Sequence, residues 1–295
     1  MRNQLLLTTL NNIDDLRSLR ALYKANGISQ VLGYQTLDNY ISWFEKEPQQ
    51  KHIKIYTLPE VWRKSGLYMI VDRYQLMVNA LDIAEAAEEL RIALPQLDWS
   101  RGYKMTGVPD AHHETIYKLL TKMNLLIGIV RLHVVLKSRE EALKLDVSCS
   151  SPEFDYHPLS QEEAAIVDGI WYSRGNGTLK FIERLIAYNN NMGIYLKSTG
   201  ELIAWCIRCN LGLLGMLHVK DDYRGRGLAK LLVQMLSRQL AGAGEDVLTM
   251  ISDQNATSQA LFKKLKFEEI GLTYIYRTKR HEDSEIWSDE LEAAE

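Results

Sequence analysis

A turn with two glycines and two arginines is the part of this sequence whose residue types best suit chemistry. Arg224-Gly-Arg-Gly227 follows an apolar run at 213–219 and precedes leucines at helical spacing from Leu228 onward. Glycines let the backbone approach an anion closely, and the first N–H groups of a helix point outward unpaired at the positive end of its dipole. The pattern therefore predicts a phosphate-binding turn between a strand and a helix.

The elements that must position this turn follow from hydrophobic periodicity and from turn residues. Three strands in meander order lead to it, at 193–197, 201–210 and 213–219. After it we expect helix 227–240, strand 246–252, helix 256–265 and strand 267–278. Upstream, Ser160 and Glu163 form a capping box that opens a helix to about Trp171, and another helix is expected over 177–188.

The first half of the chain is a mixture of helices and strands without a recognisable chemical motif. The pattern predicts helices at 12–26, 36–46, 83–93, 110–124 and 138–144, and strands at 52–57, 66–72, 75–80, 103–108 and 125–136. Small polar residues and a proline cluster at Cys149-Ser-Ser-Pro-Glu153, which favours a linker there. We therefore expect an α/β (α+β) protein with a smaller N-terminal domain at 1–150, a domain at 151–280 and an acidic tail at 281–295.

Composition narrows the classes of function. The chain has 295 residues, a net charge of -3 and no basic stripe, which argues against a general nucleic-acid binder. No apolar run approaches the roughly 18 residues of a membrane span, and the N-terminal run of three leucines is too short for a signal peptide. Three cysteines are too few for a disulfide framework, so the default setting is a reducing cytoplasm.

Two residue pairs invite a metal interpretation, and we expect neither to bind one. Cys206 and Cys209 lie three apart on a predicted strand, so their side chains should face opposite ways. His112 and His113 lie at a helix start, where exposed polar residues are common, and they have no partner one helical turn later. The sequence therefore predicts no metal cofactor.

Two well-known phosphate motifs fit the turn badly. A P-loop requires G-x-x-x-x-G-K-[ST], and that spacing is absent. A dinucleotide-binding fingerprint requires a third glycine where this chain has Lys230, and its strand opens a βαβ unit, whereas here the strand ends a meander.

A third pattern fits. Tyr223-Arg-Gly-Arg-Gly-Leu-Ala229 resembles the [RQ]-x-x-G-x-[GA] motif of the GNAT superfamily of acyl-CoA-dependent N-acyltransferases. Asp253-Gln-Asn-Ala-Thr-Ser-Gln-Ala-Leu-Phe-Lys-Lys-Leu-Lys-Phe267 is similar to the superfamily's downstream N-x-x-[SA]-x-x-L-[YF]-x-K-x-G-F signature. The order of elements over 155–278 matches as well. The resemblance implies a GNAT fold with a mixed, mostly antiparallel central sheet.

Weaker motifs look like those of the glycine N-acyltransferase family. They are Trp171, Gly175-Asn176, Phe181-Ile-Glu-Arg184, Asp222-Tyr-Arg224 and Leu97-Asp-Trp99. That resemblance implies a degenerate, GNAT-like α/β region over 1–150 and glycine or a related amino acid as the acyl acceptor.

The resemblance also implies how acyl-CoA is held. Strands 213–219 and 246–252 would be splayed, with the backbone of Leu217 and Val219 pairing with the pantetheine arm. The pyrophosphate would lie against the backbone N–H groups and arginines of the turn, and helix 256–265 would line the cofactor. The residues concerned are Arg224, Gly225, Arg226, Gly227, Leu228 and Ala229 for the pyrophosphate, and Asn255, Ser258 and Phe262 from the helix region.

Acyl transfer to nitrogen requires an uncharged amine, a base, an oxyanion donor and a leaving thiolate. The resemblance assigns the base to Asp222, although a free Asp has a pKa near ~3.9 and needs burial or a bridging water to act near neutrality. His218, with an ordinary pKa near ~6.5, is a second candidate by position, its alternative being a packed strand residue. The N–H near Val219 is the expected oxyanion donor. Phe262 stands where the superfamily often has a tyrosine, so no general acid is expected there.

The sequence thus predicts an enzyme that transfers an acyl group from acyl-CoA to a small amine. One alternative acceptor is an arylalkylamine, a polyamine or a protein lysine. A second alternative is a non-catalytic acyl-CoA-binding or interaction protein. We expect no nucleic-acid or membrane partner and a cytoplasmic location, with a mitochondrial one allowed by family analogy; oligomeric state is not predicted.

Overall fold

The computed structural model describes residues 5–148, 151–175 and 177–280. These residues form two compact units: an N-terminal unit of 5–133 with 270–280, and a C-terminal unit of 134–269. The division falls between His133 and Val134, inside a strand, whereas the linker expected from sequence is Cys149–Glu153, of which residues 149–150 lie outside the described part. Asn176 and the expected acidic tail also lie outside it.

The N-terminal unit is built on a sheet of strand order β1-β2-β3-β4-β5-β12-β6. Its first five strands are β1 (Thr8–Thr9), β2 (Ile53–Thr57), β3 (Tyr68–Asp72), β4 (Gln75–Asn79) and β5 (Lys104–Pro109). They are antiparallel except for β4 and β5, which are parallel. Its helices are α1 (Ile13–Ala25), α2 (Val31–Lys46), α3 (Trp62–Ser65), α4 (Ala86–Ala93) and α5 (Asp110–Lys122).

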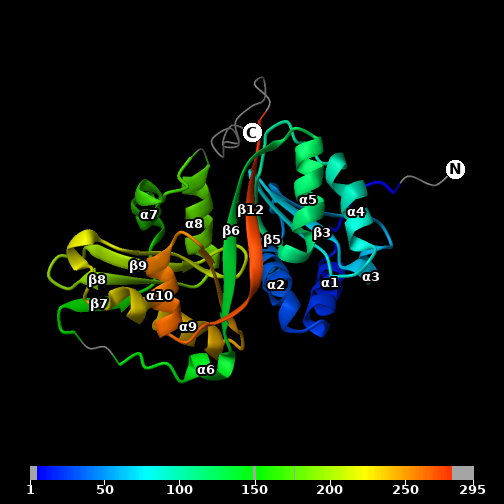
Figure 1. Cartoon of the computed structure of the whole chain (residues 1–295). Coiled ribbons are helices and arrows are strands. Elements are labelled where there is room, and N and C mark those ends of the chain that lie inside the picture. The colour runs from blue at the N-terminus through cyan, green and yellow to red at the C-terminus, as the bar shows by residue number, and fades with distance from the viewer. Residues whose placement is uncertain (1–4, 149–150, 176, 281–295) are drawn as a thin grey trace. The chain divides into compact units, whose positions relative to one another are not determined.

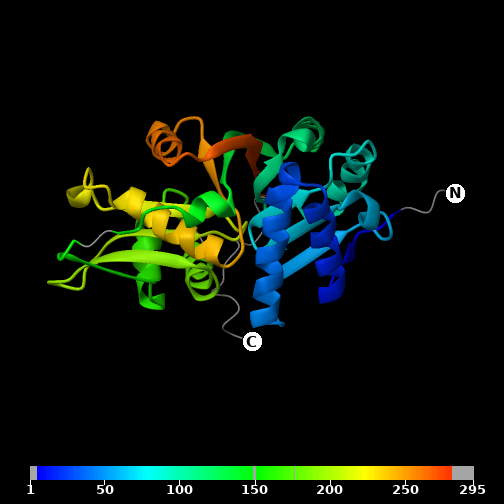
Figure 2. The same cartoon turned by 90° about the horizontal axis from the view of Figure 1, so that it is seen from below.

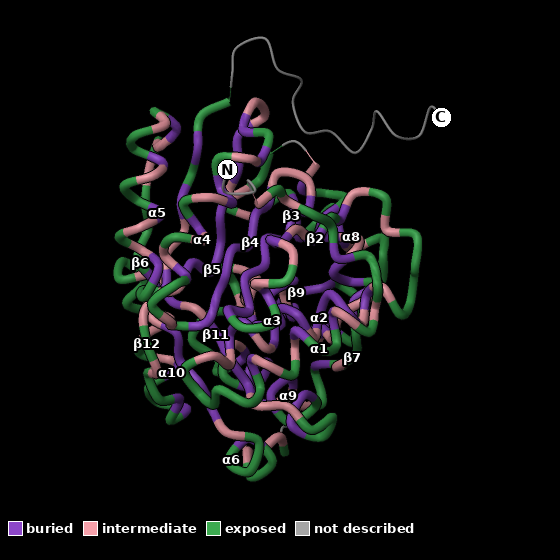
Figure 3. Tube along the Cα trace, turned by 90° about the vertical axis from the view of Figure 1, so that its right-hand side faces the viewer, coloured by how far each residue is buried: buried purple, intermediate pink, exposed green. Residues whose placement is uncertain are grey.

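Caps and apolar faces explain these helices. The Asn12 side chain accepts a hydrogen bond from the N–H of Asp14 (2.9 Å), which satisfies one orphan donor at the start of α1. The buried face of α1 includes Leu19 and Tyr23, and α1 packs beside α2, the two blue helices of Figure 2. Figure 3 colours β3 and β4 as buried, in agreement with a fully buried class for every residue of both strands.

The C-terminal unit has strand order β6-β11-β10-β9-β8-β7. Its own strands are β7 (Phe154–His157), β8 (Asn191–Leu196), β9 (Leu202–Arg208), β10 (Leu214–Val219) and β11 (Val247–Ser252). They are antiparallel except for β10 and β11, which are parallel. Its helices are α6 (Arg139–Leu143), α7 (Ala164–Ile170), α8 (Thr178–Tyr188), α9 (Leu228–Gly242) and α10 (Ala256–Lys264).

Helix α9 organises the core of this unit. Its leucines, Leu232 and Leu236 among them, are fully buried against strand residues such as Ile194 and Ala204. Figure 1 shows α8 and α9 on opposite sides of β8 and β9. Burial of a leucine side chain contributes about 1.5–3 kcal/mol, so this face fixes α9, and with it the turn that precedes α9, on the sheet.

The two longest strands each cross the division between the units. β6 (Leu126–Lys137) closes the first half of the sequence, yet its residues 134–137 belong to the C-terminal unit. β12 (Glu268–Thr278) closes the second half, yet its residues from Ile270 belong to the N-terminal unit and pair with β5, with Tyr276 opposite Met105. Each unit therefore includes part of the last strand of the other half of the sequence.

The fold class expected from sequence is confirmed: the protein is mixed α/β with large, mostly antiparallel pairing. The sequence missed β1, α3 and β7, which have two to four residues each and are too short for a periodic signal. It also began α2 five residues late. The capping box is confirmed, with the N–H of Ser160 bound to the Glu163 carboxylate (2.7 Å). No described helix is long and apolar enough to cross a membrane.

Candidate functional site

Strands β10 and β11 diverge almost as soon as they meet. Although they are neighbours in the sheet, their register holds a single aligned pair, Leu214 with Thr249. The Thr249 hydroxyl donates to the carbonyl of Leu214 (2.8 Å) and reinforces that pair. The rest of β10 has no aligned partner on β11. The splay expected from sequence is thus present at this point of the sheet.

A β-bulge turns β10 away. The register with β9 shifts between Gly215 and His218, so Met216 and Leu217 lie opposite the single residue Cys206. Met216 has a φ of 47°, in the left-handed region that non-glycine residues seldom occupy. A bulge bends its strand and increases the local twist, which is the physical reason for the divergence.

Residues 215–219 of β10 are partly exposed to solvent, although β10 lies within the sheet. Every residue of β9 is buried, whereas 215–219 of β10 are only partly buried. The N–H of Lys220 donates to the Ile203 carbonyl across β9 (2.9 Å), and residues alternate in direction along an antiparallel pair. The N–H and C=O of Val219 therefore lie on the side away from β9, and Leu217 precedes Val219 by two residues within the bulge.

The turn after β10 has the conformation that its glycines suggested. A short 3-10 helix at Asp221–Tyr223 leads to Gly225 (φ 76°) and Gly227 (φ 81°). Gly227 is the N-cap of α9, and its carbonyl accepts from the N–H of Leu231 (3.1 Å). No atom lies within 4 Å of where a Cβ on either glycine would stand. The left-handed backbone, not a lack of space, therefore requires glycine, and the first N–H groups of α9, at Leu228 and Ala229, begin at an exposed turn.

The two arginines of the turn have different neighbours. Arg224 donates from Nε to the Val219 carbonyl (3.2 Å) and pairs through Nη2 with Asp221 (2.7 Å). Arg226 pairs with both carboxylate oxygens of Glu153, at 2.5 and 3.5 Å, and lies over the ring of Phe154. Sequence reasoning missed Glu153, which is 73 residues away. A phosphate at this turn would share Arg226 with a carboxylate.

His218 lies on the half-exposed part of β10. Its ring stacks on Trp205 of β9, with ring centroids 4.8 Å apart and planes at 29°. Burial lowers the pKa of His218, as do the positive charges of Arg224 and Lys220, and Asp221 opposes them. The imidazole is therefore neutral at pH 7, the form that can accept a proton.

Asp222, the other candidate base, lies in the short helix of the turn with an exposed side chain. Among the described residues no hydrogen bond or ion pair of its carboxylate is found. The burial that a catalytic carboxylate near neutral pH requires is not present at this position.

The candidate ligand-binding residues after β11 differ in burial: Asn255 and Ser258 lie near the surface, and Phe262 lies in the core. Asn255 caps α10, because its side-chain oxygen accepts from the N–H of Ser258 (3.0 Å), and both residues lie at the surface end of the helix. Phe262 is 5% exposed and packs edge-on against Phe267, with centroids 5.0 Å apart. Its side chain is part of the core, so it can contribute little surface to a bound ligand.

The histidine pair in the N-terminal unit corrects one expectation. His112 is buried, not exposed, and its Nε2 lies 2.8 Å from the Ala80 carbonyl. His113 Nδ1 lies 2.5 Å from the Tyr276 hydroxyl, and the imidazole stacks on Tyr274. Within the described ranges, no group of three or more His, Cys, Asp or Glu is placed to hold a metal ion. Cys206 and Cys209 are both free thiols.

Comparison with known proteins bears on the site and on the fold. Residues 191–276, which include β10, the turn and α10, match the family model described as FR47-like protein. No curated protein matches the chain. A Drosophila protein of known X-ray structure is 25% identical, with a TM-score of 0.84 over 94% of this chain and 99% of its own.

Two further solved structures share the fold at low identity. A tandem GNAT protein from the clavulanic acid biosynthesis pathway is 13% identical, with a TM-score of 0.56 over 95% of this chain and 100% of its own. A GCN5-related N-acetyltransferase from Sphaerobacter thermophilus is 11% identical, with a TM-score of 0.52 over 97% and 98%. The chain has the tandem GNAT fold. The likeness to these two structures is one of fold, and the family-model match covers residues 191–276 of the C-terminal unit.

Proposed function

We propose that this protein transfers an acyl group from acyl-CoA to the nitrogen of a small amine. The observation that carries the proposal is the junction of β10 with α9. A partly buried, bulged strand, of whose described residues only Leu214 is aligned with β11, leads through a short 3-10 helix into a glycine turn at a helix N-terminus. Few ligands combine an extended amide-bearing arm with a diphosphate, and coenzyme A does so.

The proposed binding mode uses backbone groups first. The pantetheine amides pair with Leu217 and Val219 as an added strand on the open side of β10, as edge groups of a sheet can accept an extended ligand. The diphosphate lies against the N–H groups from Gly225 to Ala229, with Arg224 and Arg226 supplying positive charge. The exposed glycines suit such a group, because no atom lies within 4 Å of where a Cβ on Gly225 or Gly227 would stand.

In the proposed chemistry His218 is the base. Its neutral ring takes the proton from the attacking ammonium, directly or through one water, so that the free amine attacks the thioester carbonyl. The N–H of Val219 donates to the oxyanion that forms. The C–S bond then breaks, and coenzyme A leaves as a thiolate, which a thiol pKa near ~8.5 permits without an acid at Phe262. The second proton that the nitrogen loses as the amide forms passes to this thiolate, directly or through water.

Asp222 remains the alternative base through family resemblance. It is testable against His218 in one comparison of variants, His218→Gln and Asp222→Asn, each measured for turnover and for acyl-CoA affinity. We expect turnover to fall in the first and to change little in the second. A large loss confined to Asp222→Asn would transfer the role of base to Asp222.

We propose glycine or a related amino acid as the acyl acceptor, supported by the motifs shared with the glycine N-acyltransferase family. An arylalkylamine, a polyamine or a protein lysine is the alternative within the same chemistry. A cytoplasmic location is proposed from the low cysteine content of the chain.

One experiment tests the activity. The purified protein is titrated with acetyl-CoA and longer acyl-CoAs in a calorimeter, and thiol release is then followed with a panel of amines. We expect one acyl-CoA site per chain and release that depends on an amine. Binding without amine-dependent release would favour a non-catalytic acyl-CoA-binding protein, and a lack of binding would refute the proposal.

A further inference from the structure

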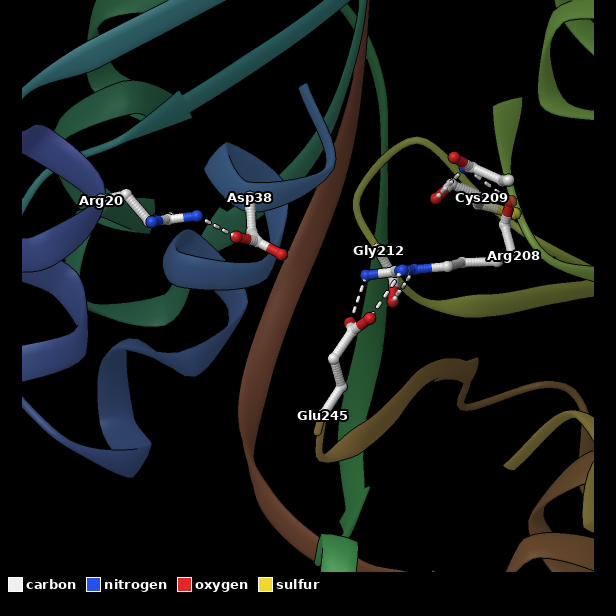
Figure 4. Close-up of polar contacts among 7 residues, drawn as sticks. Arg20, Asp38, Arg208, Cys209, Gly212 and Glu245 are labelled. Atoms are coloured by element: carbon white, nitrogen blue, oxygen red, sulfur yellow. Dashed lines mark hydrogen bonds and ion pairs between the residues drawn. The ribbon is translucent and has the colours of Figure 1, made fainter. Parts of the chain in front are cut away.

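A buried ion pair lies where β10 and β11 begin. Arg208, the last residue of β9, is 7% exposed, and its guanidinium donates from Nη1 and Nη2 to both oxygens of Glu245 (Figure 4). The Nη1 contact measures 3.0 Å. Arg208 also donates from Nε to the Gly212 carbonyl (3.3 Å), so one side chain holds the turn between β9 and β10 and the residue pair before β11.

These contacts surround the one point where β10 and β11 stay together. Arg208 is opposite Leu214 in the β9–β10 pair, and Leu214 is the residue aligned with Thr249 on β11. Glu245 precedes the first residue of β11 by two positions. The ion pair therefore links the β9–β10 turn to the loop before β11, beside the point from which β10 and β11 diverge.

The start of β11 is held from its other side as well. The carboxylate of Asp246 accepts from the backbone N–H of Arg139 (2.8 Å), next to the end of β6. Glu245 and Asp246 thus anchor the loop before β11 in two directions. Further along, residues 216–219 have no aligned partner on β11, so the separation of the two strands there depends on how their ends are fixed.

We propose that Arg208 is a positioning residue for the acyl-CoA site, setting the angle between β10 and β11 through its bidentate pair with Glu245. The inference rests on the proposed function, because the open side of β10 is where the pantetheine arm would bind. The described contacts of Arg208 are with the β9–β10 turn and Glu245, not with the glycine turn at 224–227. Arg208 acts through the strand ends, and a change in angle there moves Val219 and His218 relative to the thioester.

The chemistry of the pair explains why arginine is required. A planar guanidinium makes two parallel hydrogen bonds to a carboxylate and so fixes orientation as well as distance, whereas a lysine ammonium fixes only distance. A variant that keeps the charge but loses the second hydrogen bond should therefore remain folded, with a less well fixed angle between β10 and β11. Displacements of about 1 Å at a reacting centre can reduce rates about 100-fold.

The test compares charge-retaining variants with a matched ion pair elsewhere. Arg208→Lys and Glu245→Asp should raise the KM for acyl-CoA about 10-fold or more while the protein still unfolds cooperatively and the KM for the amine stays close to that of wild type. The control is Arg20→Lys, which alters the Arg20–Asp38 pair of the N-terminal unit (Figure 4) and should leave both constants unchanged. The double variant Arg208→Glu with Glu245→Arg should bind acyl-CoA more tightly than either of its single substitutions, because it brings opposite charges together again.

The outcomes separate the two proposals. If wild type turns over and both charge-retaining variants keep its KM for acyl-CoA, the positioning role is wrong and the proposed function stands. If the variants lose only thermal stability, with kcat and both KM values unchanged below the melting temperature, the pair is purely structural and the inference fails. If wild type binds no acyl-CoA, the proposed function and this inference fail together.

Discussion

The two units of this protein use nearly the same succession of elements and differ where chemistry would take place. In each, a first strand is followed by two helices, then by an antiparallel meander of three strands, although the short helix α3 lies between β2 and β3 in the N-terminal unit. A helix next connects the last meander strand to a parallel neighbour, and a second helix and a long strand complete the series. β4, α4, β5 and α5 in one unit thus correspond to β10, α9, β11 and α10 in the other.

The difference lies at the junction of strand and helix. Between β4 and α4 the chain reads Ala80-Leu-Asp-Ile-Ala-Glu85, without glycine or arginine, whereas between β10 and α9 it reads Lys220-Asp-Asp-Tyr-Arg-Gly-Arg-Gly227. Every residue of β4 is buried, and 215–219 of β10 are not. β4 has two aligned pairs with β5 and a continuous register with β3, whereas β10 has one pair with β11 and a bulge opposite β9.

The succession of elements alone does not create the candidate site, because both units have it and only the C-terminal unit has the bulged strand and the glycine turn at this junction. Two local changes convert a closed sheet into a candidate binding strand: a bulge that turns one strand outward, and left-handed glycines that expose a helix N-terminus. Each change costs stability, because a non-glycine residue in the left-handed region is strained and half-exposed strand residues bury less apolar surface.

The largest expected effect contrasts a histidine from each unit. His218→Gln should reduce kcat about 10²–10⁴-fold, because it removes the general base, and should leave acyl-CoA affinity near that of wild type. His113→Gln, which breaks the contact with Tyr276, should leave kcat unchanged in protein that remains folded. Steady-state kinetics and calorimetry measure both. An equal loss of kcat in both variants would contradict the assignment of the catalytic base to the C-terminal unit.

The glycines of the turn come next. Gly225→Ala and Gly227→Ala should each weaken acyl-CoA binding about 10-fold, because a Cβ in the left-handed region costs about 1–2 kcal/mol and the turn relaxes away from the anion. Gly200→Ala is the matched control: Gly200 has a φ of 71° and open space around it, but it lies in the β8–β9 turn. It should lose similar stability with no loss of affinity, and calorimetry would reveal any departure.

The pH profile is a smaller effect with a defined sign. Because burial lowers the pKa of His218, the neutral imidazole persists below the ordinary histidine pKa of ~6.5. The plateau of kcat/KM should therefore extend below pH 6.5 and then fall as pH decreases through the folded-state pKa. His218→Gln should lack this acid limb. A limb retained in that variant would assign the titration to another group.

The smallest expected effect concerns Glu153. Glu153→Gln frees Arg226 from an exposed ion pair, so acyl-CoA should bind up to about 5-fold more tightly, in line with the ~0.2–1 kcal/mol of such pairs. Glu183→Gln, which removes the exposed pair of Glu183 with Lys180, is the control and should not change the dissociation constant. Weaker binding in Glu153→Gln would mean that Glu153 orients Arg226 for the phosphate.

Much of the fold could be predicted from local signals. The Asn12 cap, the Ser160–Glu163 box and the leucines of α9 each act within one or two turns of chain, so the helices they define were predicted to within a few residues. The same holds for the glycine turn, because the left-handed φ at Gly225 and Gly227 is a property of single residues. His112 was misjudged because its burial depends on Ala80, 32 residues away.

The sequence by itself determined the order of elements, the glycine turn and the candidate base on β10, because periodicity, caps and residue type are local properties. Only the tertiary structure decided which strands complete which unit and where β10 bulges. It alone brought Arg208 to Glu245 and Arg226 to Glu153, across 37 and 73 residues. The physical reason is that strand exchange and ion pairing depend on the packing of distant segments, where pairing energy and loop closure compete, and no short stretch of sequence encodes that balance.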